Sequence, residues 1–409
     1  MQLDADWAGL TFRSARPQVL AVLLRELGSL ERAEEAFQEA CLKALQAWAT
    51  NGPPRNAAGW LTVVGRNAGI DQVRRNTRER ALPETISSPI EVDEEDIDTA
   101  TYGDDLLRLL FICCHRDLKA HQQIALALRI VSGLTVAEVA AAFLLGEKAM
   151  AQRLTRAKRV VRQADTAFET PSPLVRTERL STVSTMIYLM FNQGYAASAQ
   201  ESTRTQALGA EAVRLGRLLL DLYPDEPELL GLVGLMLLQE ARSSARFDED
   251  GGSILLKDQN RTLWDRRMIA EGTALTDRAF RMRRPGRFQL QAGIAALHAR
   301  AMRFEDTDWV QIEQLYRALT EAEPTPVVAL NHAVAVSQVY GASAALALVE
   351  PLAGALDDYF YFHAVRGHLL EMLARPAEAL AAYGSSLRLA TSIAEAAQVR
   401  AFIDRLQQR

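Results

Sequence analysis

The side chains with the clearest capacity for chemistry are the basic and amide groups between Lys148 and Arg162, a stretch that contains no acid. Helical spacing predicts that Met150, Leu154 and Val161 form one buried face. The opposite face and its flanks would expose five side chains that bind phosphates or base edges: Lys148, Gln152, Arg153, Arg156 and Arg159. Guanidinium and amide groups are the natural readers of guanine and adenine edges. This helix is therefore a candidate for contact with DNA.

Two helices joined by a glycine-containing turn would present this basic face. The first runs from Val136 to Phe143, Thr135 suits its N-cap, and Glu138 completes a capping box. Gly146 provides the turn, and the basic helix follows directly. A short helix, a tight turn and a basic second helix are typical of a helix-turn-helix, whose second helix enters the major groove. Any αα-hairpin has similar periodicity, but the acid-free basic run favours DNA binding.

A second basic surface is predicted on a helix from about Ala57 to Glu79, which follows a turn that begins at Asn51. One face would carry polar side chains at i, i+4, i+7, i+8 and i+11: Asn67, Asp71, Arg74, Arg75 and Arg78. Clustered Arg with Asn on one helix suits phosphate contact and the reading of base edges. The spacing therefore allows two interpretations: a nucleic-acid-binding face, or a charged face that is simply exposed to solvent.

Two further helices precede this one. The first has an apolar stripe at helical spacing, formed by Leu20, Leu23, Leu24 and Leu27. Pro17 would lie near its start and Gly28 at its end. The second helix, from about Glu31 to Trp48, carries an acidic face that is expected to be exposed to solvent: Glu34, Glu35, Gln38 and Glu39.

The charges of the chain are segregated into blocks. Nine acids and no Lys or Arg lie between Ala81 and Leu107, where two prolines and a Ser-Ser pair indicate a solvated linker. A second boundary is expected at residues 169–173. The net charge of −5, from 46 Lys and Arg against 51 Asp and Glu, excludes a uniformly cationic surface. This small net charge arises because the basic helices and the acidic linker nearly cancel and the rest of the chain is close to neutral. The net charge is therefore compatible with DNA binding at two small sites.

Length and composition predict an all-α protein of 409 residues in two or three domains. The cysteines Cys41, Cys113 and Cys114 cannot build a disulfide framework and are expected to be small buried side chains in a reducing cytoplasm. The most apolar window, Leu229–Leu238, is too short to span a bilayer. Residues 248–252 resemble the start of a calcium loop that lacks its twelfth-position carboxylate. We therefore expect a cytoplasmic protein without enzymatic activity, cofactor or metal.

The motifs together resemble the sigma-70 family, and specifically its extracytoplasmic-function (ECF) sigma factors. AEEAFQEA (33–40) and WLTVVGRNAGIDQVRR (60–75) resemble sigma domain 2. LLFICCH (109–115), GLTVAEVA (133–140) and MAQRLTRAKR (150–159) resemble sigma domain 4. FNQGY (191–195), DQNR (258–261), QLQA (289–292) and LNHAVA (330–335) resemble the subgroup with a tetratricopeptide-like C-terminal extension. The resemblance implies domain 2 at residues 1–80, the linker at 81–105, domain 4 at 106–166 and the extension at 172–409.

The resemblance also implies roles for these surfaces in promoter recognition. Domain 2 would bind the clamp helices of the RNA polymerase β′ subunit through Glu35, Gln38 and Glu39. It would open the −10 element with nine residues: Asn51, Arg55, Asn56, Arg66, Asn67, Asp71, Arg74, Arg75 and Arg78. Domain 4 would bind the β flap and contact the −35 element through the basic face at 148–159. Trp48 and Trp60 are interpreted as core residues in preference to platforms for flipped bases.

A repeat of 34 residues, the tetratricopeptide period, supports this interpretation of the extension. Three positions recur: Ala333, Ala345 and Val349 match Gly367, Ala379 and Tyr383. Such arrays bind peptides or pack on a neighbouring domain, so the expected partner is a peptide or another part of the chain. The polar candidates for a regulatory surface are more readily explained as caps and interhelical hydrogen bonds than as a ligand pocket: Asp258, Gln259, Trp264, Asp265, Glu271, Gln289, Gln291, His298 and Asn331.

The function implied is a promoter-specificity subunit of RNA polymerase whose activity the extension regulates. Two alternatives remain open. One is a helix-turn-helix regulator that uses the helical array as a sensor, and the other is a peptide-binding scaffold. The domain 2 motif distinguishes them, because neither alternative needs it.

Overall fold

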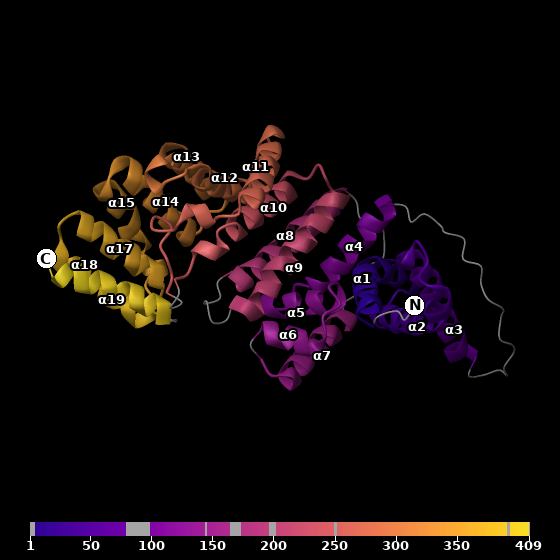
Figure 1. Cartoon of the computed structure of the whole chain (residues 1–409). Helices are drawn as coiled ribbons and strands as arrows, with labels where there is room; N and C mark the ends of the chain where they lie inside the picture. Colours follow the sequence, from indigo (N-terminus) through magenta and orange to yellow (C-terminus); the bar gives the residue numbers. More distant parts are fainter. Residues whose placement is uncertain are drawn as a thin grey trace. The chain divides into compact units, whose positions relative to one another are not determined.

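A computed structural model gives the structure of the chain (Figure 1). It describes residues 5–78, 99–143, 145–163, 173–195, 202–248, 252–390 and 393–408. Within these ranges the fold is all-α, as predicted, and the one β-type pairing is an isolated bridge between Phe247 and Ser253. The chain divides into two compact units, residues 1–190 and 191–409, and each is described by itself.

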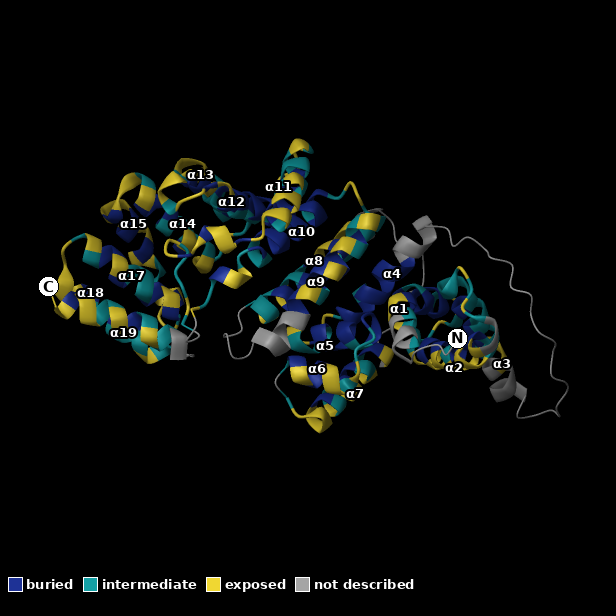
Figure 2. Ribbon diagram, viewed as in Figure 1, coloured by how far each residue is buried: buried dark blue, intermediate teal, exposed yellow. Residues whose placement is uncertain are grey.

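Unit 1 contains the first eight helices: α1 (Ala5–Leu27), α2 (Leu30–Asn51), α3 (Ala57–Arg78), α4 (Thr99–Cys113), α5 (Ala120–Ile130), α6 (Val136–Ala142), α7 (Glu147–Gln163) and most of α8 (Pro173–Tyr195). Helix α1 packs against α2, α3 and α4, and α7 packs against α5 and α6. Figure 2 shows the buried faces of these helices in dark blue. Apolar residues at helical spacing therefore turn inward on each of them.

Helix α1 is longer than the leucine stripe predicts. It begins at Ala5, so Pro17 lies inside the helix and not near its start as expected. The additional turns have an apolar contact of their own, because the ring of Phe12 lies 5.6 Å from that of Trp48. The end at Gly28 is confirmed: this residue has φ +65°, a conformation that glycine adopts at little cost, and ends the helix.

The region expected to be an acidic linker differs from the expectation at its C-terminal end. Residues 79–98 lie outside the described residues, but α4 already begins at Thr99. Asp105, one of the acids assigned to the solvated linker, is buried, and its carboxylate lies 2.6 Å from Arg25 of α1. The helix packs on α1 because Leu106, Leu107 and neighbouring apolar residues need a buried face, and Arg25 neutralises the acid that enters with them.

The three cysteines are free thiols, and two of them are buried. Burial raises the pKa of Cys41 and of Cys114 to about 12, and it also raises the pKa of Cys113. The thiols are therefore protonated at neutral pH and lack the nucleophilic thiolate. They act as small core side chains.

Unit 2 contains the remaining helices: α9 (Ser202–Leu222), α10 (Pro227–Glu240), η1 (Ser243–Ala245), η2 (Arg261–Leu263), α11 (Arg266–Arg281), α12 (Arg287–Arg300), η3 (Phe304–Asp306), α13 (Trp309–Ala322), α14 (Pro326–Tyr340), α15 (Ala342–Val349), η4 (Glu350–Leu352), α16 (Ala353–Leu356), α17 (Phe360–Met372), α18 (Pro376–Leu389) and α19 (Ile393–Gln407). Helix α10 is buried on all sides and packs on α9, α11 and α12. The later helices pack mainly on their neighbours in sequence. None of the helices among the described residues is long and apolar enough to cross a membrane.

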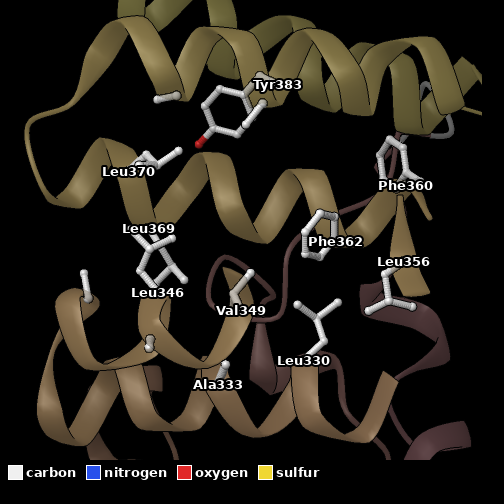
Figure 3. Packing of buried hydrophobic residues seen from close by; sticks show 14 of the residues in the cluster. Leu330, Ala333, Leu346, Val349, Leu356, Phe360, Phe362, Leu369, Leu370 and Tyr383 are labelled. Atoms are coloured by element: carbon white, nitrogen blue, oxygen red, sulfur yellow. The ribbon is translucent and has the colours of Figure 1, made fainter. Parts of the chain in front are cut away.

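The residues of the 34-residue repeat lie together in one core (Figure 3). Ala333 and Val349 of α14 and α15 are fully buried, as are Ala379 and Tyr383 of α18. Tyr383 packs over Gly367 of α17, where a Cβ atom would lie 2.7 Å from the tyrosine ring. The small residue at Gly367 thus allows α17 and α18 to approach, and the bulky Tyr383 fills the space between them.

We expect Gly367→Ala to destabilise unit 2 by about 1–3 kcal/mol, because the added methyl group meets an aromatic ring that is itself fully buried. The matched control is Gly384→Ala on α18, where the Cβ atom has open space. This control should be neutral or stabilise the helix by up to about 1 kcal/mol. Thermal unfolding followed by circular dichroism measures both, and an equal or higher melting temperature for Gly367→Ala would contradict the packing described.

Candidate functional site

Helix α7 presents the predicted basic face. Met150, Leu154 and Val161 are buried, as expected from their spacing. The polar residues of the opposite face are exposed, with Arg153 half-buried among them: Lys148, Gln152, Arg153, Arg156 and Arg159. None of the four cations in this set forms an ion pair with another described residue. The face therefore carries positive charge that is free to bind an external anion.

A capping box fixes the start of α6, the helix that precedes α7. The backbone N–H of Thr135 donates to Glu138 Oε2 at 2.7 Å, and the backbone N–H of Glu138 donates to Thr135 Oγ1 at 3.1 Å. Burial raises the pKa of Glu138, but the hydrogen bonds from Thr135 and the charge of Arg13 outweigh it and lower the pKa overall. This confirms the predicted cap and ties α6 to the turn that follows α5.

The potential around the start of α7 is positive. The pKa of His121, on α5, is lowered first by partial burial and then by the charges of Arg153 and Lys119. A neutral imidazole beside two cations is the state that such a potential favours. The cationic surface of α7 thus extends onto the N-terminal end of α5.

On α2 the three residues predicted to bind the polymerase are exposed. Glu35, Gln38 and Glu39 all lie on the outward face, and Glu39 forms an exposed ion pair with Lys43 at 3.8 Å. An exposed i,i+4 pair of this kind contributes only about 0.3–0.5 kcal/mol. Glu39 can therefore exchange Lys43 for an external basic partner at little cost.

Of the nine residues predicted to contact the −10 element, the five with described side chains do not form one continuous exposed face. Arg55 and Asp71 are exposed and Asn67 is half-buried. Asn56 caps α3, because its Oδ1 accepts from the backbone N–H of Gly59 at 2.8 Å. Arg66 donates two hydrogen bonds of 2.8 Å to the carboxylate of Glu26 on α1. The side chains of the remaining four lie outside the described residues: Asn51, Arg74, Arg75 and Arg78.

Helices α1 and α2 are joined to the second half of unit 1 by charged contacts that the sequence did not indicate. Glu34 accepts from Arg16 Nη2 at 3.3 Å and from Lys158 Nζ at 2.6 Å. The Nε of Arg16 also donates to the carbonyl of Ile130 at the end of α5, at 2.9 Å. Arg162 of α7 binds Glu31 of α2 at 2.8 Å. We call Arg16, Glu34 and Lys158 the unit 1 charge cluster.

Glu34 was expected on the exposed acidic face, and this expectation is wrong. Its side chain is only 10% exposed, and that of Arg16 is 9% exposed. Helical spacing places Glu34 beside Gln38, but the approach of α7 covers this end of the face and supplies Lys158 as a partner. A buried carboxylate with two cationic partners replaces a solvated one.

We expect Glu34→Gln to destabilise unit 1 by about 3–5 kcal/mol, because it leaves the buried guanidinium of Arg16 without a counter-charge. Urea unfolding of the full chain, with hydrogen exchange of α2 and α7 to localise the effect, measures the loss. Glu39→Gln on the same helix is the control and should cost less than about 1 kcal/mol. Equal costs for the two variants would show that the cluster does not stabilise unit 1.

The polar residues singled out in unit 2 do not gather into one surface. Four of them have partners within unit 2. Asp265 caps α11, Glu271 pairs with Arg217 of α9 at 2.8 Å, and the Gln289 side chain donates to Arg284 O at 2.6 Å. Gln259 donates to the carbonyl of Ile254 at 3.0 Å. Asp258 and Asn331 are exposed and Gln291 is half-buried. Trp264 and His298 lie with Gln259 in a buried cluster that includes two arginines, Arg242 and Arg261, which the sequence reasoning did not select.

No group of three or more His, Cys, Asp and Glu side chains is placed to hold a metal ion in the ranges that the structure covers. Asp248 instead accepts a hydrogen bond from the backbone N–H of Gly252 in its own loop, at 2.5 Å. Residues 249–251 of the segment interpreted as a turn lie outside the described residues.

Comparison with known proteins identifies two segments and one full-length relative. Residues 11–79 match the family described as sigma-70 region 2, and residues 179–280 match a family of unknown function (DUF6596). An uncharacterized protein of Rhizobium meliloti (strain 1021) is 54% identical over 408 residues, which cover 98% of this chain and 96% of the relative. The chain belongs to the same family as this protein.

The sigma-70 region 2 match spans most of α1 and all of α2 and reaches the end of α3. The predicted resemblance of the N-terminal part to sigma-70 is thereby confirmed, and a role in transcription initiation with RNA polymerase follows from it at this general level. The second match begins within α8 and ends within α11, so it covers the buried helix α10 and the loop that contains Trp264.

Proposed function

We propose that this protein is an ECF-type sigma factor that binds core RNA polymerase and directs it to specific promoters. The observation that carries the proposal is the sigma-70 region 2 match to residues 11–79, where α2 keeps Glu35, Gln38 and Glu39 exposed. In this proposal the acidic face of α2 binds the β′ clamp helices. Binding to a basic partner surface requires the exposed acids that α2 has.

Helices α6 and α7 act in the proposal as the helix-turn-helix of sigma domain 4, which sits on the β flap and reads the −35 element. Two features support this assignment. The cations on the exposed face of α7 have no intramolecular ion-pair partners among the described residues. The N-terminal half of the helix, with Lys148 and Gln152, is exposed, and this is the half of a recognition helix that contacts base edges. For the −10 element, the candidates among the described side chains that are not engaged in a cap or an ion pair are Arg55, Asn67 and Asp71.

The helical array of unit 2 is proposed to be the tetratricopeptide-like extension that regulates the sigma factor. The buried 34-residue repeat supports this assignment. As a partner of RNA polymerase the protein would act in the cytoplasm and have no catalytic activity of its own.

Run-off transcription with purified core polymerase and the full chain tests the proposal. We expect the chain to bind core polymerase and to yield transcripts from a subset of genomic fragments. Sequence-specific DNA binding without any affinity for core polymerase would instead identify a helix-turn-helix regulator. A chain that binds neither core polymerase nor promoter DNA would overturn the proposal and leave a peptide-binding scaffold.

Charge reversal on α2 should weaken the complex with core polymerase. The double variant Glu35→Lys and Glu39→Lys places like charges against the partner surface, so we expect an affinity roughly tenfold lower or more. Fluorescence anisotropy with labelled protein measures it. Glu178→Lys on α8 reverses one charge at an exposed site outside α2 and should leave the affinity unchanged. Equal affinities for all three proteins would contradict the assigned face.

Removal of a guanidinium from α7 should weaken recognition of the −35 element. We expect Arg156→Ala to cost about 1–3 kcal/mol of promoter binding by the reconstituted holoenzyme if it contacts a base. Competition between promoters with native and substituted −35 sequences measures the loss. Arg116→Ala, at an exposed arginine of the turn before α5, is the control. Undiminished selectivity in Arg156→Ala would exclude this residue from base reading.

A further inference from the structure

Two arginines without an acidic partner among the described residues lie at the C-terminal end of α10 and in the loop after it: Arg261 is buried and Arg242 is half-buried. Arg242 and Arg261 both lie against Trp264, with their Cζ atoms 5.4 Å and 4.9 Å from the ring centroid. His298, near the end of α12, is close enough for both charges to act on its ring. We call Arg242, Arg261, Trp264 and His298 the arginine cluster. All four residues belong to unit 2.

Neither arginine forms an ion pair with any residue that the structure describes. The Nε of Arg242 donates to the amide oxygen of Gln259 at 3.3 Å. The Nη1 of Arg261 donates to the backbone carbonyls of His298 and Ala301, both at 2.8 Å. These acceptors are neutral, so the hydrogen bonds orient the guanidinium groups but do not cancel their charge.

The electrostatics of the cluster show an excess of positive charge. The pKa of Arg242 is lowered, mainly by burial; Tyr195 acts to raise it and Arg246 to lower it. Burial also lowers the pKa of Arg261, as does Arg242, while Glu305 and Asp306 raise it from a distance. Asp306 is already bound to Arg303 at 3.0 Å. The pKa of His298 falls to about 4, first through burial and then through both arginines.

The cluster also holds polar atoms that have no partner. Arg261 is 6% exposed and Trp264 is 2% exposed. Among the described residues, Arg261 Nη2, Trp264 Nε1 and His298 Nδ1 are buried and make no hydrogen bond. Unsatisfied buried polar groups are rare in folded proteins and need a specific explanation.

Stacking on Trp264 explains only part of this arrangement. A guanidinium over an indole ring gains cation–π attraction, and Trp264 itself packs in an apolar core with Leu238, Ala241 and Ala296. This stacking leaves Arg261 Nη2 and Trp264 Nε1 without an acceptor and does not neutralise the charge of either arginine. An anion placed among these groups would accept hydrogen bonds from the unpartnered N–H groups and would neutralise positive charge.

We propose that the arginine cluster binds a small oxyanion, either a phosphate or a carboxylate group. The planar guanidinium fork matches two oxygens of such a group, and charge-assisted hydrogen bonds of this kind are the strong ones. In this proposal Arg242 and Arg261 supply the charge. Trp264 Nε1 supplies a hydrogen-bond donor, and the unpartnered Nδ1 of His298 is the further ring nitrogen at the site. The site lies in unit 2, so the proposal is independent of the sigma-factor assignment.

Isothermal titration calorimetry of the full chain at constant ionic strength tests the proposal. Inorganic phosphate and acetate serve as separate probes, which distinguishes a phosphate site from a carboxylate site. We expect saturable binding of at least one probe with one site per chain. Hydrogen exchange in the presence of the bound probe should show protection of residues 253–265.

Two variants remove parts of the site and keep the core. Arg242→Gln removes one charge, and Trp264→Phe removes the indole N–H but retains an aromatic ring. Each should weaken binding about tenfold or more, because each loses a hydrogen bond to a charged group. Arg300→Gln on α12 removes an exposed arginine that pairs with Asp277 and should leave binding unchanged.

Two results would overturn the proposal. One is the absence of saturable binding for both probes. The other is wild-type affinity in both Arg242→Gln and Trp264→Phe, which would place the bound anion elsewhere, for example on α7. Thermal unfolding of each variant without anion confirms that it is folded, so weakened binding reports on the site.

Discussion

The Glu34 carboxylate is the charge on which the arrangement of unit 1 depends. It is buried between the guanidinium of Arg16 and the ammonium of Lys158, so one acid joins α1, α2 and α7. Removing a carboxylate from water costs several kcal/mol unless cations and hydrogen bonds replace the solvent. Glu34 therefore stabilises the structure only where both partners are present. This requirement sets the distance of α7 from α2 more strictly than apolar contacts would.

The same contact divides α7 into two parts with different uses. Its C-terminal half is anchored, because Lys158 and Arg162 bind Glu34 and Glu31 of α2. Its N-terminal half, with Lys148 and Gln152, is exposed. A basic helix in which every cation was paired internally would have little charge left for a polyanion. Here the acids of α2 take up two cations and leave the others available.

Local interactions were the ones that the sequence could predict. The capping box of Thr135 and Glu138 lies within four residues, and the stripe of Met150, Leu154 and Val161 follows helical period, so both were found. The burial of Glu34 and Asp105 depends on partners more than 70 residues away in the chain, Lys158 and Arg25. Periodicity indicates which residues share a face, but it does not indicate which acid on that face a distant helix will cover.

The unit 1 charge cluster and the arginine cluster handle charge away from solvent in opposite ways. In unit 1 a buried acid has two cations, and the site is complete within the chain. In unit 2 the arginine cluster has one buried and one half-buried cation, and the hydrogen-bond acceptors of both are neutral. A folded chain tolerates this imbalance where stacking on Trp264 and carbonyl contacts offset the desolvation. The desolvation free energy that is not offset comes from the buried donors that have no acceptor among the described residues. Stacking on Trp264, the bond from Arg242 to Gln259 and the bonds from Arg261 to backbone carbonyls already hold both guanidinium groups in place. The unpartnered Arg261 Nη2 and Trp264 Nε1 therefore point to a partner from outside the chain.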